Sequence, residues 1–130
     1  MRALRIAVPP VVAGVLIALS LPPWGWWPLA FVGFAWLYRA TEDATRGRRA
    51  LIGWLAGIGL YGVGLFWMAE FTLPGSVLAV LLSALYVSGA AALVPATGAA
   101  RAAAFPGAVL LTEAFRQVFP FEGLPLAGVA

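Results

Sequence analysis

Long apolar runs separated by short polar breaks extend along the whole chain. Residues 50–69 and 77–100 contain no charged side chain. About 20 apolar residues are enough for a helix to cross the hydrocarbon core of a bilayer, because each residue rises about 1.5 Å. These two runs therefore predict membrane-spanning helices.

Three shorter runs complete the pattern. Residues 6–21 and 26–38 flank the Pro22-Pro23 pair, so they form either two crossings or a hairpin that dips into the membrane and returns. The fifth run starts at residue 102 and needs the stretch from Thr112 to Val118 to reach the far side. The sequence thus predicts an all-α fold, a polytopic transmembrane bundle of about five helices with the first two short.

We expect one N-terminal transmembrane domain over residues 1–130. Its predicted helices cover residues 6–21, 26–38, 50–70, 77–100 and 102–118, and a polar cytoplasmic linker covers residues 39–49.

Composition indicates a membrane protein with little chemistry of its own. Hydrophobic residues make up 63% of the chain and charged residues 10%, against roughly 45–50% and about 25% in soluble domains. Cysteine, histidine and lysine are absent, which excludes a disulfide, a thiol nucleophile, an imidazole base and a zinc site. We therefore expect no catalytic residue, metal or cofactor in this chain. The arginines lie in gaps between apolar runs and not on one wet face, so we expect no nucleic-acid partner.

The placement of the arginines predicts the orientation. Five crossings would put all but one of them on the same side, which the positive-inside rule assigns to the cytoplasm. The seven arginines on the cytoplasmic side would be Arg2, Arg5, Arg39, Arg46, Arg48, Arg49 and Arg101. The other side receives Trp24, Trp26 and Trp27, which suit an aromatic belt at the headgroups. The N-terminus is then cytoplasmic and the C-terminal end points outward.

The first run also has an alternative interpretation as a cleaved signal peptide. Arg2 and Arg5 form a basic start, and Ala18-Leu19-Ser20 resembles a small-residue cleavage site. Against it, the run is long, Pro9-Pro10 interrupts it, and further apolar runs follow at once.

Glycines in the third run indicate helix packing. The string from Gly57 to Gly62 matches the G-x-G-x-x-G pattern, but that pattern binds a dinucleotide only between a strand and a helix N-terminus. Small residues spaced three or four apart instead let helices approach closely in lipid. We expect Gly53, Gly57 and Gly64 to serve this packing.

Three charged residues lie near the predicted outer ends of helices. Glu113 and Arg116 are three residues apart on one helical face, so they can pair, and a structural ion pair is the simpler interpretation. Glu70 ends its run beside a loop, where solvation at the interface explains it as well as function does.

Four segments, in their order along the chain, resemble apolipoprotein N-acyltransferases. The first runs from Leu21 to Ala30 and is similar to the family's proline- and tryptophan-rich stretch between the first two helices. The second runs from Gly62 to Trp67 and precedes a loop with Pro74-Gly75. The third, Leu111-Thr112-Glu113-Ala114-Phe115-Arg116, is similar to the family's E-x-x-R helix. The fourth is Gly123-Leu124-Pro125, although the family's following Trp is Leu126 here.

The resemblance implies an enzyme of the bacterial cytoplasmic (inner) membrane. Such enzymes transfer an acyl chain from a phospholipid to the N-terminal amine of the diacylglyceryl-cysteine of an apolipoprotein, through a cysteine in a nitrilase-like domain. That domain follows the membrane helices in the family, so we expect this chain to be an N-terminal fragment that is inactive alone. Its partners would be the phospholipid donor, the apolipoprotein acceptor and membrane lipids.

The resemblance also implies roles for single residues. Arg116 would contact a phospholipid headgroup, because a guanidinium suits phosphate with two N–H groups, and Glu113 would hold Arg116 in place. Gly123 would lie on the same outer-leaflet surface, and Trp67 would contribute to the lipid-binding site.

Two functions from other classes stay open on the residues themselves. One is a small transporter that uses Glu70 or Glu113 as a membrane carboxylate. The other is a non-catalytic membrane subunit that packs against a partner through the face from Gly53 to Gly64.

Overall fold

The structure, a computed structural model, describes residues 1–119 of the chain. These residues form five α-helices and one 3₁₀ helix: α1 (Arg2–Leu19), α2 (Pro28–Ala40), α3 (Arg46–Gly64), η1 (Phe66–Glu70), α4 (Leu73–Leu93) and α5 (Ala100–Val118). The predicted all-α fold with five helices is confirmed.

Threonine side chains start two of the helices. The Thr45 hydroxyl accepts a hydrogen bond from the Arg48 backbone N–H at 3.3 Å, and the Thr72 hydroxyl accepts one from the Gly75 N–H at 3.3 Å. Such caps satisfy N–H groups that have no partner within the first turn. Pro74 in the first turn of α4 needs no N–H partner there, so the turn signal at Pro74-Gly75 marks a helix start.

Several helix boundaries differ from those expected. α4 ends at Leu93 and not at residue 100, because Pro95 forces the preceding residue out of the helical region and Val94 is extended, with ψ of 133°. The chain after Gly64 tightens into η1, so α3 does not reach residue 70.

The first helix is also longer than expected. α1 runs from Arg2 with Pro9 and Pro10 inside it and has 18 residues, so that only α2, with 13, is short. Arg39 and Ala40 belong to α2 and Arg46 begins α3, which reduces the linker expected over 39–49 to residues 41–45.

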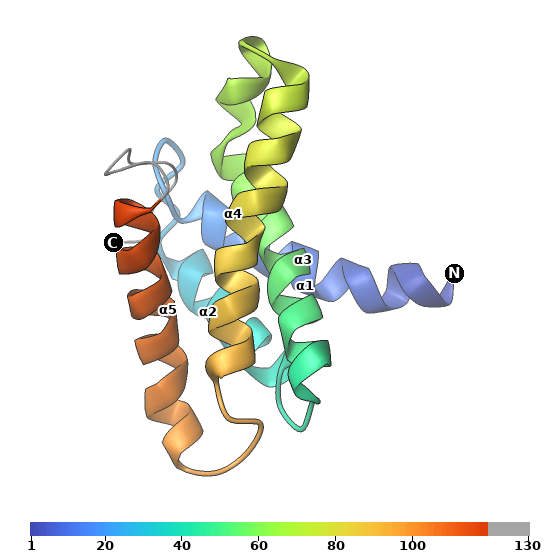
Figure 1. Ribbon diagram of the computed structural model, residues 1–130, viewed down its shortest axis with the longest axis vertical. Coiled ribbons are helices and arrows are strands. Elements are labelled where there is room, and N and C mark those ends of the chain that lie inside the picture. The colour runs from blue at the N-terminus through green and yellow to red at the C-terminus, as the bar shows by residue number, and fades with distance from the viewer. Residues whose placement is uncertain (120–130) are drawn as a thin grey trace.

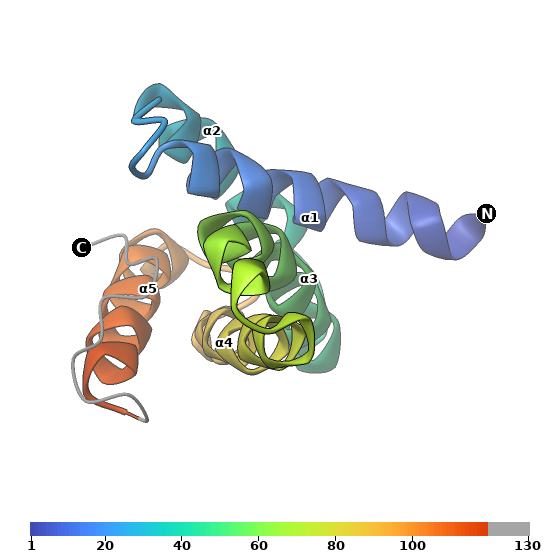
Figure 2. The same cartoon turned by 90° about the horizontal axis from the view of Figure 1, so that it is seen from above.

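The helices are arranged around α3. In Figure 1, α3 and α4 stand side by side and antiparallel, and α5 stands beside α4, while α1 runs across them. Figure 2 shows that the N-terminal half of α1 extends away from the other helices and that α2 lies along its other half.

Glycine allows α3 to lie close to both neighbours. A Cβ on Gly53 would lie 2.6 Å from the Val87 carbonyl oxygen, and one on Gly57 would lie 2.7 Å from the Ala84 Cα, both on α4. On the opposite side, a Cβ on Gly14 of α1 would overlap the carbonyl oxygen of Ala56. These are backbone contacts of the kind that small residues permit in lipid.

The glycine face of α3 is therefore covered by α4 of the same chain. Gly53 and Gly57 lie in this contact, whereas Gly64 is half-buried at the last position of α3. A partner that docks on this face, as a non-catalytic subunit would, finds it occupied.

Two helices of the described residues, α1 and α4, are long and apolar enough to cross a membrane. Only 28% of the most apolar window of each is buried, whereas the core helix of a soluble protein is mostly buried. On α4, Leu78, Leu82 and Leu85 form one exposed stripe at helical spacing. An apolar surface of this extent is suited to lipid and not to water.

A buried arginine joins the two connections at one end of the bundle. Arg101 is 2% exposed; its Nη1 donates to the Pro95 carbonyl at 2.8 Å and its Nη2 donates to the Thr41 hydroxyl at 2.8 Å and to the Tyr38 carbonyl. Its guanidinium also lies 4.4 Å from the centroid of the Tyr38 ring. The start of α5 is thereby fixed to the end of α2.

We predict that Gly14→Ala lowers the free energy of unfolding by about 1–3 kcal/mol, because α1 must move away from the Ala56 backbone to admit the methyl group. Unfolding in detergent of the protein expressed from its complete gene measures the change. Gly89→Ala is the control: a Cβ there has no atom within 4 Å, so it should stabilise α4 slightly. Equal stability of the two variants would contradict the close contact.

Candidate functional site

Glu113 and Arg116 form a buried ion pair on α5. The Arg116 Nε donates to Glu113 Oε2 at 3.2 Å and Nη2 donates to Oε1 at 2.5 Å, so the guanidinium holds both carboxylate oxygens. Arg116 is 4% exposed and Glu113 is 7% exposed. The pairing expected from their spacing is present, and it is the one salt bridge among residues 1–119.

Aromatic side chains from α3 and α4 complete the surroundings of the pair. The Arg116 guanidinium lies 5.6 Å from the centroid of the Tyr61 ring, which is buried on α3. The Tyr86 hydroxyl of α4 donates to the carbonyl of Phe119, just after α5. The end of α5 is thus bound to α3 through a cation and to α4 through a hydroxyl.

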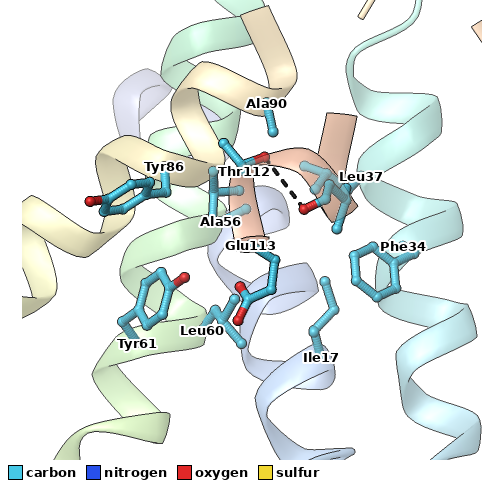
Figure 3. A pocket seen from close by; sticks show the side chains of 12 residues that line it. Ile17, Phe34, Leu37, Ala56, Leu60, Tyr61, Tyr86, Ala90, Thr112 and Glu113 are labelled. Atoms are coloured by element: carbon cyan, nitrogen blue, oxygen red, sulfur yellow. Dashed lines mark hydrogen bonds between the residues drawn. The ribbon is translucent and has the colours of Figure 1, made fainter. Parts of the chain in front are cut away.

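The pair borders a small cavity between α5 and the other helices. The cavity has a volume of about 40 Å³ and is mostly apolar, with the Glu113 carboxylate and the Thr112 hydroxyl among its polar groups (Figure 3). Its lining residues are Ile17, Phe34, Leu37, Ala56, Leu60, Tyr61, Tyr86, Val87, Ala90, Val109, Thr112 and Glu113.

The size of the cavity limits what it can hold. About 10–15 Å³ of such space is needed for one water molecule, whereas pockets for organic ligands measure about 300–1,000 Å³. The cavity therefore has room for water beside the Glu113 carboxylate but not for a phospholipid.

The other residues expected at this site lie elsewhere or outside the described part. Trp67 is in η1, 43% exposed, with its ring packed edge-on against Phe71 at 6.0 Å between centroids. It does not line the cavity. Gly123 and Leu126 lie beyond residue 119, outside the described residues.

The pair offers binding and positioning but no nucleophile. The chain holds no cysteine, lysine or histidine, and no group of three potential metal ligands occurs within residues 1–119. A guanidinium fixed by a carboxylate can orient an anion or hold a helix in place.

Sequence reasoning missed the side chains that hold α5 in place. Tyr61 and Tyr86 were indistinguishable from packing residues, and Arg101 counted only as one of the cytoplasmic cations. One available signal was that Arg101 has apolar residues on both sides, since an isolated charge in such a setting is usually paired or faces the interior.

We predict that Arg116→Met destabilises the protein by about 3–5 kcal/mol, because it leaves the Glu113 carboxylate buried without its partner. The double variant Glu113→Leu/Arg116→Met should lose much less free energy of unfolding than the sum of the losses in the single variants Glu113→Leu and Arg116→Met. Denaturant unfolding in detergent gives all four values of this cycle. The exposed Arg48→Met is the matched control and should change stability by less than about 0.5 kcal/mol. Additive single effects would contradict the coupling.

Comparison with known proteins extends these observations. Residues 13–130 match the family described as "Apolipoprotein N-acyltransferase N-terminal domain". The chain is 40% identical over 65 residues to the apolipoprotein N-acyltransferase of Photobacterium profundum, a match that covers 50% of this chain and 12% of that protein.

Two further relatives carry the same name. Identity is 38% over 56 residues for the protein of Pseudomonas syringae pv. tomato, covering 43% of this chain and 11% of the relative. It is 38% over 64 residues for that of Caulobacter vibrioides, covering 46% and 12%. The matched stretches are thus a small part of the relatives' length. Because the family match covers most of the described residues, the resemblance deduced from the motifs is confirmed, and the chain belongs to the apolipoprotein N-acyltransferase N-terminal domain family.

Proposed function

We propose that this chain is the membrane part of an enzyme that moves an acyl chain from a phospholipid to the N-terminal diacylglyceryl-cysteine amine of an apolipoprotein. The segment supplies the lipid-contacting platform and not the nucleophile, so it is inactive by itself. The family membership supports the reaction, and the exposed apolar faces of α1 and α4 support a platform in the bilayer.

The observation that carries the proposal is the buried Glu113–Arg116 pair. It lies on the segment whose motif resembles the family's, and it holds the end of α5 against Tyr61 of α3. A charge pair is costly to bury in a membrane and is therefore a candidate for function. We assign to Arg116 the phosphate of the acyl donor and to Glu113 the orientation of the guanidinium.

Contact with a phosphate requires movement near the end of α5. Arg116 is 4% exposed, and the adjacent cavity is too small for a headgroup. The Tyr86 hydroxyl holds the Phe119 carbonyl in the described arrangement, so release of this bond is the step that would open access to Arg116. Trp67, exposed on η1, is a candidate contact for the lipid at the membrane surface.

We further propose a location in the bacterial cytoplasmic membrane, with the N-terminus in the cytoplasm. Two contacts support this orientation. The Asp43 N–H donates to the Ala96 carbonyl at 3.2 Å, which brings together the two connections that the arginines flank. The rings of Trp24 and Phe66 lie 5.8 Å apart, which brings the tryptophans assigned to the outside close to η1, the element that ends at Glu70 near the predicted outer end of the third run.

We predict that Arg116→Lys lowers the rate of acyl transfer by about 10- to 100-fold, because lysine keeps the charge but loses the two-pronged contact that orients the donor. N-acylation of a diacylglyceryl-cysteine lipopeptide by membranes containing the protein from its complete gene gives the rate. Arg48→Lys, on the exposed first turn of α3, is the control and should leave the rate unchanged. A wild-type rate for Arg116→Lys would refute the assigned role.

The orientation predicts opposite labelling of two introduced cysteines. Phe71→Cys should react with a membrane-impermeant maleimide in intact spheroplasts, whereas Arg48→Cys should react only after lysis. Both positions are exposed, and residues 1–130 contain no cysteine of their own, so only cysteines elsewhere in the protein need replacement. The reverse pattern would overturn the orientation.

A further inference from the structure

We propose that a groove between α2 and α5 binds one zwitterionic phospholipid, with its acyl chain along the aromatic floor and its headgroup at Arg39 and Glu42. This site is separate from the Glu113–Arg116 pair. The inference rests on the proposed membrane location and orientation but not on the acyl-transfer reaction.

The groove is open along its side and has a volume of about 680 Å³, which is within the range of ligand pockets. Its lining residues come from α2, the turn after α2 and α5, and α2 and α5 lie on the same side of the bundle in Figure 2. Its lining residues are Phe31, Phe34, Ala35, Tyr38, Arg39, Glu42 and Phe105.

Phe105 of α5 forms the floor. It is 8% exposed, and its ring packs edge-on against Phe34 at 6.4 Å and against Tyr38 at 5.2 Å between centroids. Arg101, one turn before it, fixes the Tyr38 wall through the ring and the carbonyl. The floor is therefore a rigid apolar surface.

The charged residues lie at one end of this apolar surface. Arg39 occupies the last turn of α2 and Glu42 follows the helix, and both are exposed. An arginine matches the geometry of phosphate, and a carboxylate accepts hydrogen bonds from an ammonium group. One positive and one negative group beside an apolar groove complement a lipid whose headgroup carries both a phosphate and an amine.

The separation of the groove into an apolar surface and a charged end favours a lipid over a protein partner. The apolar floor matches an acyl chain, and the two exposed charges of opposite sign at its end match the phosphate and the amine of one headgroup. Arg39 lies on the side assigned above to the cytoplasm, so the bound lipid belongs to the cytoplasmic leaflet. The acyl donor, in contrast, is assigned to the opposite leaflet at Arg116.

Native mass spectrometry of the detergent-purified protein from its complete gene tests the inference, with phosphatidylethanolamine and phosphatidylglycerol as probes. We expect phosphatidylethanolamine to bind more tightly. Arg39→Gln should weaken its binding by about tenfold, the loss typical of a charge-assisted contact. Ala35→Trp should remove the one phosphatidylethanolamine bound in the groove, because the indole would occupy the groove from an exposed position, whereas binding of the acyl donor assigned to Arg116 should remain.

Two control variants separate loss of the site from loss of the fold. Arg48→Gln removes an exposed arginine outside the groove, and Leu82→Trp adds an indole on the exposed stripe of α4. Both should bind phosphatidylethanolamine like the unmodified protein, and all four variants should keep its unfolding midpoint.

Equal binding of the two lipids, or unchanged binding by folded Ala35→Trp, would overturn the inference. Unchanged binding by Ala35→Trp is the result expected if a further segment of the protein, and not a lipid, occupies the groove. Acyl transfer measured on the same samples reports separately on the reaction at Arg116.

Discussion

The close backbone contact of α3 with α1 and α4 is the constraint on which the rest of the structure depends. In lipid, apolar side chains gain little by leaving their surroundings, so helices associate through close packing and polar contacts. Gly14, Gly53 and Gly57 provide that packing, since each lies where a side chain would meet a neighbouring helix. With α3 held on two sides, Tyr61 is fixed in the position where it meets Arg116.

The buried arginines then attach α5 to this framework at both ends. Arg101 binds carbonyl and hydroxyl groups of the segments around Tyr38, Thr41 and Pro95. Arg116 is neutralised by Glu113 and lies near the Tyr61 ring. A buried charge without a partner is costly, so each arginine restricts α5 to positions in which its partners are present. The cavity beside Glu113 and the groove over Phe105 both lie along the helix held in this way, and Phe34 of α2 lines both of them.

The helix ends illustrate how far the sequence could be interpreted. The apolar runs identified the helices because a bilayer-crossing segment must be continuously apolar, but they overestimated α4. Pro95 is apolar and so continues the run, but its ring clashes with a helical conformation of the preceding residue, and the helix therefore ends before Val94. The spacing of Glu113 and Arg116 was enough to predict their pairing, because residues three apart on one helix are neighbours regardless of the fold. Trp67 could not be placed in the same way, since its distance from Arg116 depends on how η1 follows α3.

The sequence alone determined the solvent, the helical class, the family and the local Glu113–Arg116 pair, because these depend on composition, short spacings and contiguous motifs. Only the tertiary structure decided what covers the glycine face of α3, where Arg101 finds its partners, and how deeply Arg116 is buried. The physical reason is that these properties arise from contacts between residues far apart in the chain. Tyr38 and Arg101, for example, meet only because α2 and α5 are brought together by the helices between them.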